Sequence, residues 1–173
     1  MLSFTADILW IASNPTCTSS TNTTLDTNGN VGYDTSITIG TNGNPIISYH
    51  DISNGDLKVA ACTNPICTTA SITTIDSNGF VGANTSIAIG SNGNPIISYY
   101  DASNGDLKVA ACTNPTCTPD NPTATITTID TNGYVGYYTS IAIGAKGIPI
   151  ISYHDATNFD LKVAPAWWLA GGR

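Results

Sequence analysis

The sequence predicts an all-β fold, and within that class a β-propeller, which is a ring of four-stranded antiparallel blades. A block of about 50 residues recurs, because Thr35–Cys67 and Thr85–Cys117 are almost identical and a third copy begins at Thr139. The chain contains no Glu or Gln and is rich in Thr, Ser, Ile, Asn and Gly, which disfavours helices and favours strands joined by tight turns. Each complete block holds four strand-like runs, and this is the content of one blade.

The second copy shows how turn residues separate these runs. A glycine-rich turn at 90–94 precedes Pro95, which stands at the first position of a run, where a strand tolerates its missing N–H. The pair Asn104-Gly105 is a strong hairpin signal between the second and third runs. The four runs are Thr85–Ile89, Pro95–Tyr100, Leu107–Cys112 and Thr125–Ile129.

The repeats divide the whole chain, residues 1–173, into about three and a half blades of a single repeat domain. The last ten residues, 164–173, no longer match the repeat. The expected parts are strands three and four of a partial blade at 7–26, complete blades at 35–76 and 85–130, three strands of a last blade at 139–163, and the non-repeat tail at 164–173.

Ring closure is not expected within one such chain, because a propeller usually needs at least about four blades. The missing blades can come from a longer parent chain. Alternatively, a homodimer can complete a ring of about six blades, in which each last blade receives its fourth strand from the partner's N-terminal segment. The third strand would then be present twice at each junction, from Ile8–Ala12 and from Leu161–Val163, so that one of the two must be displaced.

Charge and hydropathy exclude several classes of function. Charged residues make up 10% of the chain, the net charge is −7, and the five cationic residues are dispersed, so no nucleic-acid partner is expected. No apolar run reaches the roughly 18 residues of a membrane span. The N-terminal stretch lacks the charged and apolar regions of a signal peptide and instead matches the interior of a repeat.

Two cysteine pairs flank the turn between the third and fourth runs: Cys62 with Cys67, and Cys112 with Cys117. Opposing residues of a hairpin can reach disulfide geometry, so two disulfides are predicted, with free thiols or a zinc site as alternatives. Disulfides imply an oxidising compartment, and hence an extracellular or cell-surface protein. Cys17 has no evident partner and could link two chains.

The end of the second run carries aromatic and acidic side chains in every copy. Rings and carboxylates suit hydroxylated sugars, so these residues are candidates for glycan binding, although they can equally pack between blades and cap the following turn. A Ser48–His50–Asp51 triad is not expected, because Asp51 points to the opposite face of the strand from Ser48 and His50. No catalytic residue is therefore predicted. The candidate ligand residues are Tyr49, His50, Asp51, Tyr99, Tyr100, Asp101, Tyr153, His154 and Asp155.

An Asp-x-Asn-Gly motif follows the fourth run of each copy, beginning at Asp26, Asp76 and Asp130. Its spacing is that of the start of a calcium loop, but the bidentate Glu of such a loop is absent from the chain. A turn in which Asp bonds backbone N–H groups is the simpler interpretation. No metal or other cofactor is predicted, and weak calcium binding is the alternative.

The pattern S-I-A-I-G-x-x-G-x-P-I-I-S-Y-Y/H-D-A-S-N-G-D-L-K-V-A resembles the repeats of secreted bacterial β-propeller proteins, and it is similar to sialidase-like (BNR) and NHL-type blades. The resemblance extends from Asp7 to Val163. It implies the blade architecture and secretion, without an activity.

The leading functional hypothesis is a non-enzymatic extracellular module for structure, adhesion or ligand display, because the near-identical copies carry no unique catalytic residue. The first alternative is a lectin-like propeller that binds a glycan on or between blades. The second is a sialidase-like glycoside hydrolase, although that family uses an arginine cluster and the only arginine of this chain is Arg173.

Overall fold

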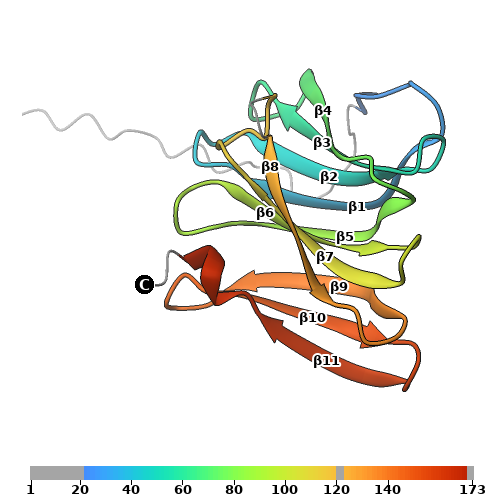
Figure 1. The fold of residues 1–173 in the computed structure, drawn as a ribbon. Helices are drawn as coiled ribbons and strands as arrows, with labels where there is room; N and C mark the ends of the chain where they lie inside the picture. Colours follow the sequence, from blue (N-terminus) through green and yellow to red (C-terminus); the bar gives the residue numbers. More distant parts are fainter. Residues whose placement is uncertain (1–21, 120–122, 171–173) are drawn as a thin grey trace, which may run out of the picture.

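The fold is a series of three antiparallel sheets that follow one another along the chain, and each sheet is one propeller blade (Figure 1). The computed structural model describes residues 22–119 and 123–170, so the strand expected within residues 7–17 and Cys17 lie outside the described residues. Within the described ranges, no helix has the length and apolar character needed to cross a membrane. The prediction of an all-β propeller fold is confirmed.

Each blade pairs its strands in chain order, from an inner strand outward. Blade 1 consists of β1 (Val31–Ile39), β2 (Pro45–Asp51), β3 (Asp56–Cys62) and β4 (Ala70–Asp76). Blade 2 consists of β5 (Val81–Ile89), β6 (Pro95–Asp101), β7 (Asp106–Cys112) and β8 (Ala124–Asp130). Blade 3 consists of β9 (Val135–Ile143), β10 (Pro149–Asp155) and β11 (Asp160–Pro165), and is followed by the 3-10 helix η1 (Trp167–Ala170).

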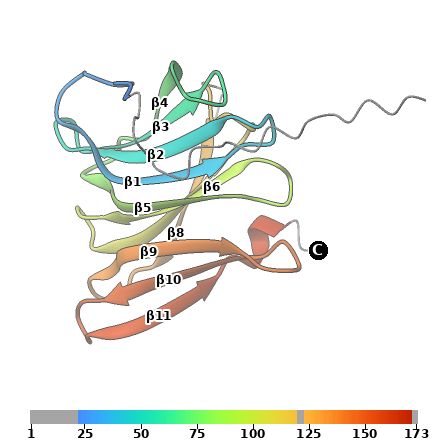
Figure 2. The ribbon, with the colours of Figure 1, turned by 180° about the vertical axis from the view of Figure 1, so that it is seen from behind.

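The inner strands β1, β5 and β9 lie side by side, so that the blades stack face to face (Figure 2). The apolar core therefore lies between blades and not within one of them. Leu57 and Val59 of β3 are fully buried in one cluster with Val81 and Ile87 of β5. In the same way, Leu107 and Val109 of β7 form a cluster with Val135 and Ile141 of β9.

Glycine allows the backbones of neighbouring blades to approach closely. Gly82 has φ +94°, and a Cβ at this position would lie 2.6 Å from Cα of Leu57 in the preceding blade. Gly136 has the same relation to Leu107, at 2.9 Å. Because any larger residue would collide with backbone here, the Val-Gly pair of each repeat is a packing requirement.

The inner strands begin four residues earlier than the sequence runs suggested. The pairing of β1 with β2 shifts register between Tyr33 and Ser36, which marks a β-bulge. The bulge residues Asp34, Asn84 and Tyr138 have φ of 50°, 53° and 52° respectively. Aspartate and asparagine tolerate this left-handed conformation better than most residues, and the bulge lets the strand continue through what looks like a link in the sequence.

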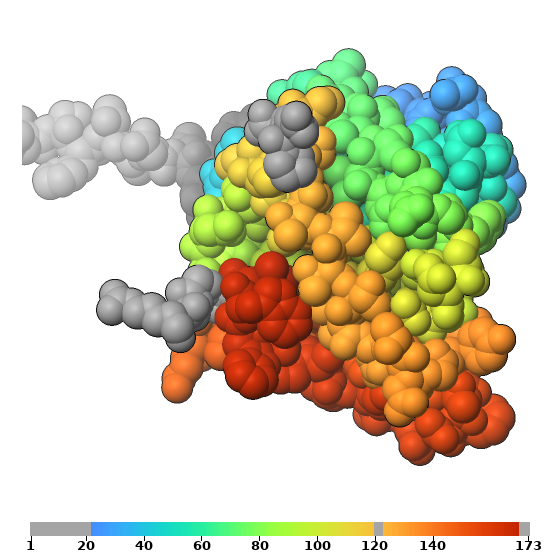
Figure 3. Space-filling view, in the orientation of Figure 1, coloured from blue at the N-terminus to red at the C-terminus, as the bar shows by residue number. Residues whose placement is uncertain are grey.

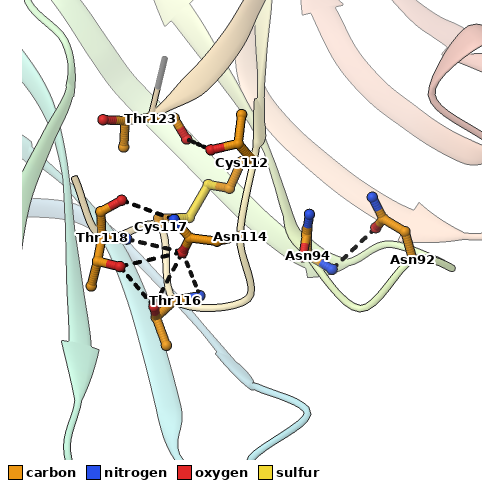
Figure 4. The surroundings of a disulfide bond; sticks show 9 residues. Asn92, Asn94, Cys112, Asn114, Thr116, Cys117, Thr118 and Thr123 are labelled. Atoms are coloured by element: carbon orange, nitrogen blue, oxygen red, sulfur yellow. Dashed lines mark hydrogen bonds between the residues drawn. A yellow bond between two sulfur atoms is a disulfide. The ribbon is translucent and has the colours of Figure 1, made fainter. Parts of the chain in front are cut away.

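Both predicted disulfides are present, Cys62–Cys67 and Cys112–Cys117, with Cα–Cα distances of 5.0 and 5.3 Å. Figure 4 shows the second one, in which Asn114 Oδ1 accepts hydrogen bonds from the backbone N–H groups of Thr116 and Thr118. Asparagine thus fixes the turn that brings the sulfur atoms together. Two disulfides fit an oxidising environment.

The C-terminal tail lies against blade 2. Trp168 and Leu169 of η1 line a depression together with Ile96 and Ala111, and Figure 3 shows η1 beside the last strand of that blade. Ala166, just before η1, is fully buried and donates its N–H to the carbonyl of Pro149 at 2.8 Å. The tail is therefore packed as part of the domain.

Truncation of a core side chain at the blade interface should destabilise the protein strongly. Leu107→Ala removes a fully buried side chain and should lower the free energy of unfolding by about 2–5 kcal/mol. Urea denaturation followed by circular dichroism measures it. Ile66→Ala, at a position 81% exposed, is the matched control and should change stability little. Equal losses for the two variants would contradict packing between blades.

Candidate functional site

A buried cluster of tyrosine, aspartate and lysine joins each blade to the next. Tyr99 of β6 donates its hydroxyl to Asp76 Oδ2 at 2.6 Å, and Asp76 ends the fourth strand of the preceding blade. Lys108 Nζ lies 3.0 Å from Asp76 Oδ2 and 3.3 Å from Asp101 Oδ2. The other two clusters are Tyr49–Asp26–Lys58–Asp51 and Tyr153–Asp130–Lys162–Asp155.

The second aspartate of each cluster also caps the turn that follows its strand. Asp101 accepts hydrogen bonds from the N–H of Ser103 and from the N–H and Nδ2 of Asn104. Six of the nine candidate ligand residues are therefore buried and engaged within the protein. They are Tyr49, Asp51, Tyr99, Asp101, Tyr153 and Asp155.

Each Asp-x-Asn-Gly motif forms a turn in which the aspartate accepts a hydrogen bond from a backbone N–H group. Asp76 Oδ1 accepts the N–H of Asn78 at 3.0 Å, and Asp26 and Asp130 accept the equivalent N–H groups. The other carboxylate oxygen of each aspartate is bonded within the Tyr–Asp–Lys cluster. The oxygens that a calcium ion would use are thus already engaged.

Burial and hydrogen bonding fix the charges of these clusters. Burial alone would raise the pKa of Asp76, but hydrogen bonds from Tyr99, from the N–H of Asn78 and from Lys108 outweigh it and lower this pKa below its ordinary value. Burial first, and then the hydrogen bond to Asp76, raise the pKa of Tyr99 far above its ordinary value. The pair is therefore a phenol that donates to an ionised carboxylate at neutral pH.

A different set of polar side chains faces the ring axis. Asp34 Oδ2 accepts the backbone N–H of Asn84 at 2.8 Å, and Asn84 Oδ1 accepts the backbone N–H of Tyr138, also at 2.8 Å. We call these three bulge residues the axial ladder. With Thr35, Thr85 and Thr139 they line a shallow pocket of about 300 Å³. Because β1, β5 and β9 are the inner strands, this pocket opens toward the central channel of a propeller.

The axial ladder stands at one of the positions where the otherwise similar repeats differ. The bulge carries Tyr33-Asp34 in blade 1, Ala83-Asn84 in blade 2 and Tyr137-Tyr138 in blade 3, while Val-Gly before it and Thr-Ser after it are the same in all three blades. Our sequence analysis missed these residues, because they lay in a segment interpreted as a link. The signal was the divergent dipeptide between two identical ones.

The remaining three candidate ligand residues, His50, Tyr100 and His154, lie close to this divergent dipeptide. In the antiparallel register, they are paired with Tyr33, Ala83 and Tyr137. The ring of Tyr100 packs on that of Tyr137 with centroids 4.1 Å apart, and Tyr138 lies 6.3 Å from His154. Aromatic rings thus border the axial ladder on the side of blade 3.

His50 is deeply buried, as Tyr100 is, but among the described residues it carries a ring nitrogen without a partner. It packs edge-to-face on Phe80 with centroids 4.9 Å apart, and its Nε2 has no hydrogen-bond partner among the described residues. Burial lowers the pKa of His50, against the opposing influence of Asp34, Asp51 and Asp56. His50 is accordingly neutral at neutral pH and contributes a ring surface, not a charge.

The axial ladder and its border present one exposed carboxylate, one amide and exposed tyrosine rings on a shallow surface. Tyr138 is 76% exposed and Tyr134, on the adjoining loop, is 63% exposed. Carboxylate and amide oxygens accept hydrogen bonds from hydroxyl groups, and ring faces pack on the apolar faces of sugars. The surface has the chemistry to hold a hydroxylated ring.

Comparison with known proteins bears on the fold. No family model matches the chain, and no curated protein matches it. Among solved structures, it is similar to the α-L-arabinofuranosidase from Lactobacillus brevis, with a TM-score of 0.55 and 15% sequence identity. The similarity covers 77% of this chain and 48% of that protein, so the chain spans about half of its length. The likeness shows the fold.

The prediction of a non-enzymatic module for structure, adhesion or display is corrected by this comparison. A solved structure that shares the fold is an α-L-arabinofuranosidase, so the fold gives no support to a non-enzymatic reading. The prediction rested on the near-identity of the copies, and the copies in fact differ at the axial ladder. The argument from identical blades therefore does not hold at the axial ladder.

Acidification should weaken the protein through the clusters. The pKa of Asp76 is lower in the folded than in the unfolded chain, so its ionised form stabilises the fold above the ordinary pKa, and this contribution is lost as pH falls through the folded value. Asp76→Asn should flatten the fall in unfolding free energy between about pH 5 and pH 2. Urea denaturation across that range measures it.

Asp106→Asn is the matched control, because burial raises the pKa of Asp106 and its linkage has the opposite sign. This control should leave the acid-induced loss of stability at least as steep as in the wild type. If the Asp76 variant were equally steep, the cluster would not be the source of the acid sensitivity.

Proposed function

We propose that the chain is part of a carbohydrate-active β-propeller whose axial surface binds a glycoside. The observation that carries the proposal is the axial ladder, in which the side chains of Asp34, Asn84 and Tyr138 replace one another at a single position of three otherwise similar blades. A position that serves only packing would carry the same residue in each blade, as Gly82 and Gly136 do. Divergence at an exposed, polar position favours recognition.

Each member of the axial ladder has a distinct part in the proposed binding. Asp34 uses Oδ2 in the ladder, which leaves Oδ1 as an acceptor for a sugar hydroxyl. Tyr138 offers an exposed ring on which the apolar face of the sugar can lie. The ladder bonds hold the carboxylate of Asp34 and the amide of Asn84 in fixed positions before the sugar arrives, and this reduces the ordering cost of binding.

Hydrolysis of the bound glycoside is the second candidate, and the similarity to an α-L-arabinofuranosidase favours it. Glycoside hydrolysis commonly uses two carboxyl groups on either side of the scissile bond. Within the described residues, the axial ladder supplies one, Asp34. In this candidate, Asp34 acts as acid, base or nucleophile, and the second carboxylate comes from the part of the ring opposite to it.

Removal of the exposed ring should weaken sugar binding. Tyr138→Ala should raise Kd for a bound oligosaccharide roughly fivefold, because ring contacts contribute about 1 kcal/mol. Isothermal titration against a panel of arabinose-containing and other oligosaccharides measures the effect. Trp167→Ala removes a 64% exposed aromatic residue of η1, which lies beside the turn after β5, and should leave Kd unchanged. Identical affinities for all three proteins would place binding elsewhere.

Turnover tests the second candidate separately. With 4-nitrophenyl α-L-arabinofuranoside and related aryl glycosides, wild-type protein should release nitrophenol, and Asp34→Asn should lower kcat roughly 10²- to 10⁴-fold. Asp106→Asn, on β7 and outside the lining of the axial pocket, should retain the wild-type rate. No turnover by the wild type, combined with binding in the titration, would reject hydrolysis and keep glycoside recognition.

A further inference from the structure

We propose that a second copy of this chain docks head to tail on the first, so that two copies close one propeller ring. The proposal concerns the two outermost faces of the blade stack and is independent of the proposed function. We call the face of blade 3 that carries Leu161 and Val163 the donor face. The face of blade 1 that carries Gly32 and Ile37 is the acceptor face.

The donor face is apolar and exposed only because no blade follows it. Leu57 and Leu107 are fully buried by the next blade, whereas Leu161 at the same position is 81% exposed. Val163 is 58% exposed, and its counterparts in blades 1 and 2 are fully buried. The donor face is thus one half of an interface that the protein already forms twice.

The acceptor face is the other half of that interface. Ile37 is 62% exposed, whereas its counterparts Ile87 and Ile141 are 6% and 8% exposed. The Cβ positions of Gly82 and Gly136 meet the leucine of the preceding blade, but among the described residues no atom lies within 4 Å of a Cβ built on Gly32. Among the described residues, nothing fills the place on blade 1 that a leucine occupies in the other two blades.

The existing interfaces specify the contacts of the new one. The N–H of Val81 donates to the carbonyl of Gly55, and that of Val135 donates to the carbonyl of Gly105, both at 2.8 Å. By the same register, Val31 donates to the carbonyl of Phe159 in the second copy. Gly32 then receives Leu161 of the second copy.

Among the described residues, no fourth strand lies beside β11, so its outer edge is open. A residue on the acceptor side can lie against this edge. Asp76 stands opposite Leu57 in the pairing of β3 with β4, and Asp130 stands opposite Leu107. Asp26 has the same bonds to Tyr49 and Lys58 that Asp76 has to Tyr99 and Lys108. In the dimer, Asp26 therefore stands opposite Leu161 of the second copy.

A second copy is the occupant that satisfies both faces at once. Blades 1 and 3 lie at opposite ends of the stack, so the donor face of a chain does not reach its own acceptor face (Figure 1). Two copies of three blades give six, which is within the usual range of about four to eight. The two junctions are identical, so the assembly closes with two-fold symmetry and leaves neither face exposed.

Ring closure also completes the axial ladder. The N–H groups of Asn84 and Tyr138 are bonded to the ladder residue of the preceding blade, and the blade that precedes Asp34 in the ring is blade 3 of the second copy. Tyr138 of the second copy then lies beside Asp34. The two Asp34 carboxylates, one from each copy, face each other across the axis of a six-bladed ring.

Light scattering coupled to gel filtration tests the proposal on the chain of residues 1–173. The wild type should have twice the chain mass of 17.9 kDa. Ile37→Lys on the acceptor face and Leu161→Asp on the donor face should each give a folded monomer. Ile66→Asp, at an 81% exposed position on a loop, is the control and should remain dimeric. A denaturing gel without reductant checks that no covalent link through Cys17 holds the copies together.

Mixing the two monomeric variants distinguishes the interface from a folding defect. A dimer of Ile37→Lys with Leu161→Asp has one wild-type junction and one junction in which lysine and aspartate are paired. The mixture should therefore regain the dimer mass, although each variant alone does not. A monomeric wild type, dimeric single variants, or a mixture that stays monomeric would each overturn the proposal.

Discussion

The close contact between the third strand of one blade and the first strand of the next determines most of this structure. Leu57 is fully buried only because Gly82 lets the following backbone lie against it. A single blade would leave this leucine and Val59 in water, at a cost of roughly 1.5–3 kcal/mol for each side chain. Blades of this kind are consequently stable as neighbours, and the ends of any stack are apolar.

The Tyr–Asp–Lys clusters set the register of that contact. Lys108 and Asp76 lie in the interior, where an unpaired charge would be costly, so the lysine is held between two carboxylates and the tyrosine donates to one of them. A slip of one blade against the next would leave these groups without partners. This structural duty accounts for the tyrosine and aspartate at the end of every second strand, and it leaves ligand recognition to other residues.

The axial ladder is the place where the constraint of packing is relaxed. Its bulge holds Tyr138 in a left-handed conformation, which costs a non-glycine residue about 1 kcal/mol or more. The hydrogen bond from its N–H to Asn84 offsets part of that cost and points the residue toward the axis. Variation among blades is tolerated here because these side chains bond at the edge of the interface and do not enter its apolar core.

Local patterns in the sequence determined the repeat, the strands, the turns and the disulfides. These signals act over a few residues, so they can be read from the sequence without the fold. Examples are Asn104-Gly105, Pro95 and the spacing of Cys112 and Cys117. The bonds from Asp76 to Tyr99 and from Asp34 to Asn84 join residues 23 and 50 positions apart. Only the stacking of blades decided which polar residues became buried in the Tyr–Asp–Lys clusters and which faced the axis. The alternation of side chains along a strand gives two faces, but it does not say whether a face packs on another blade or is exposed to solvent.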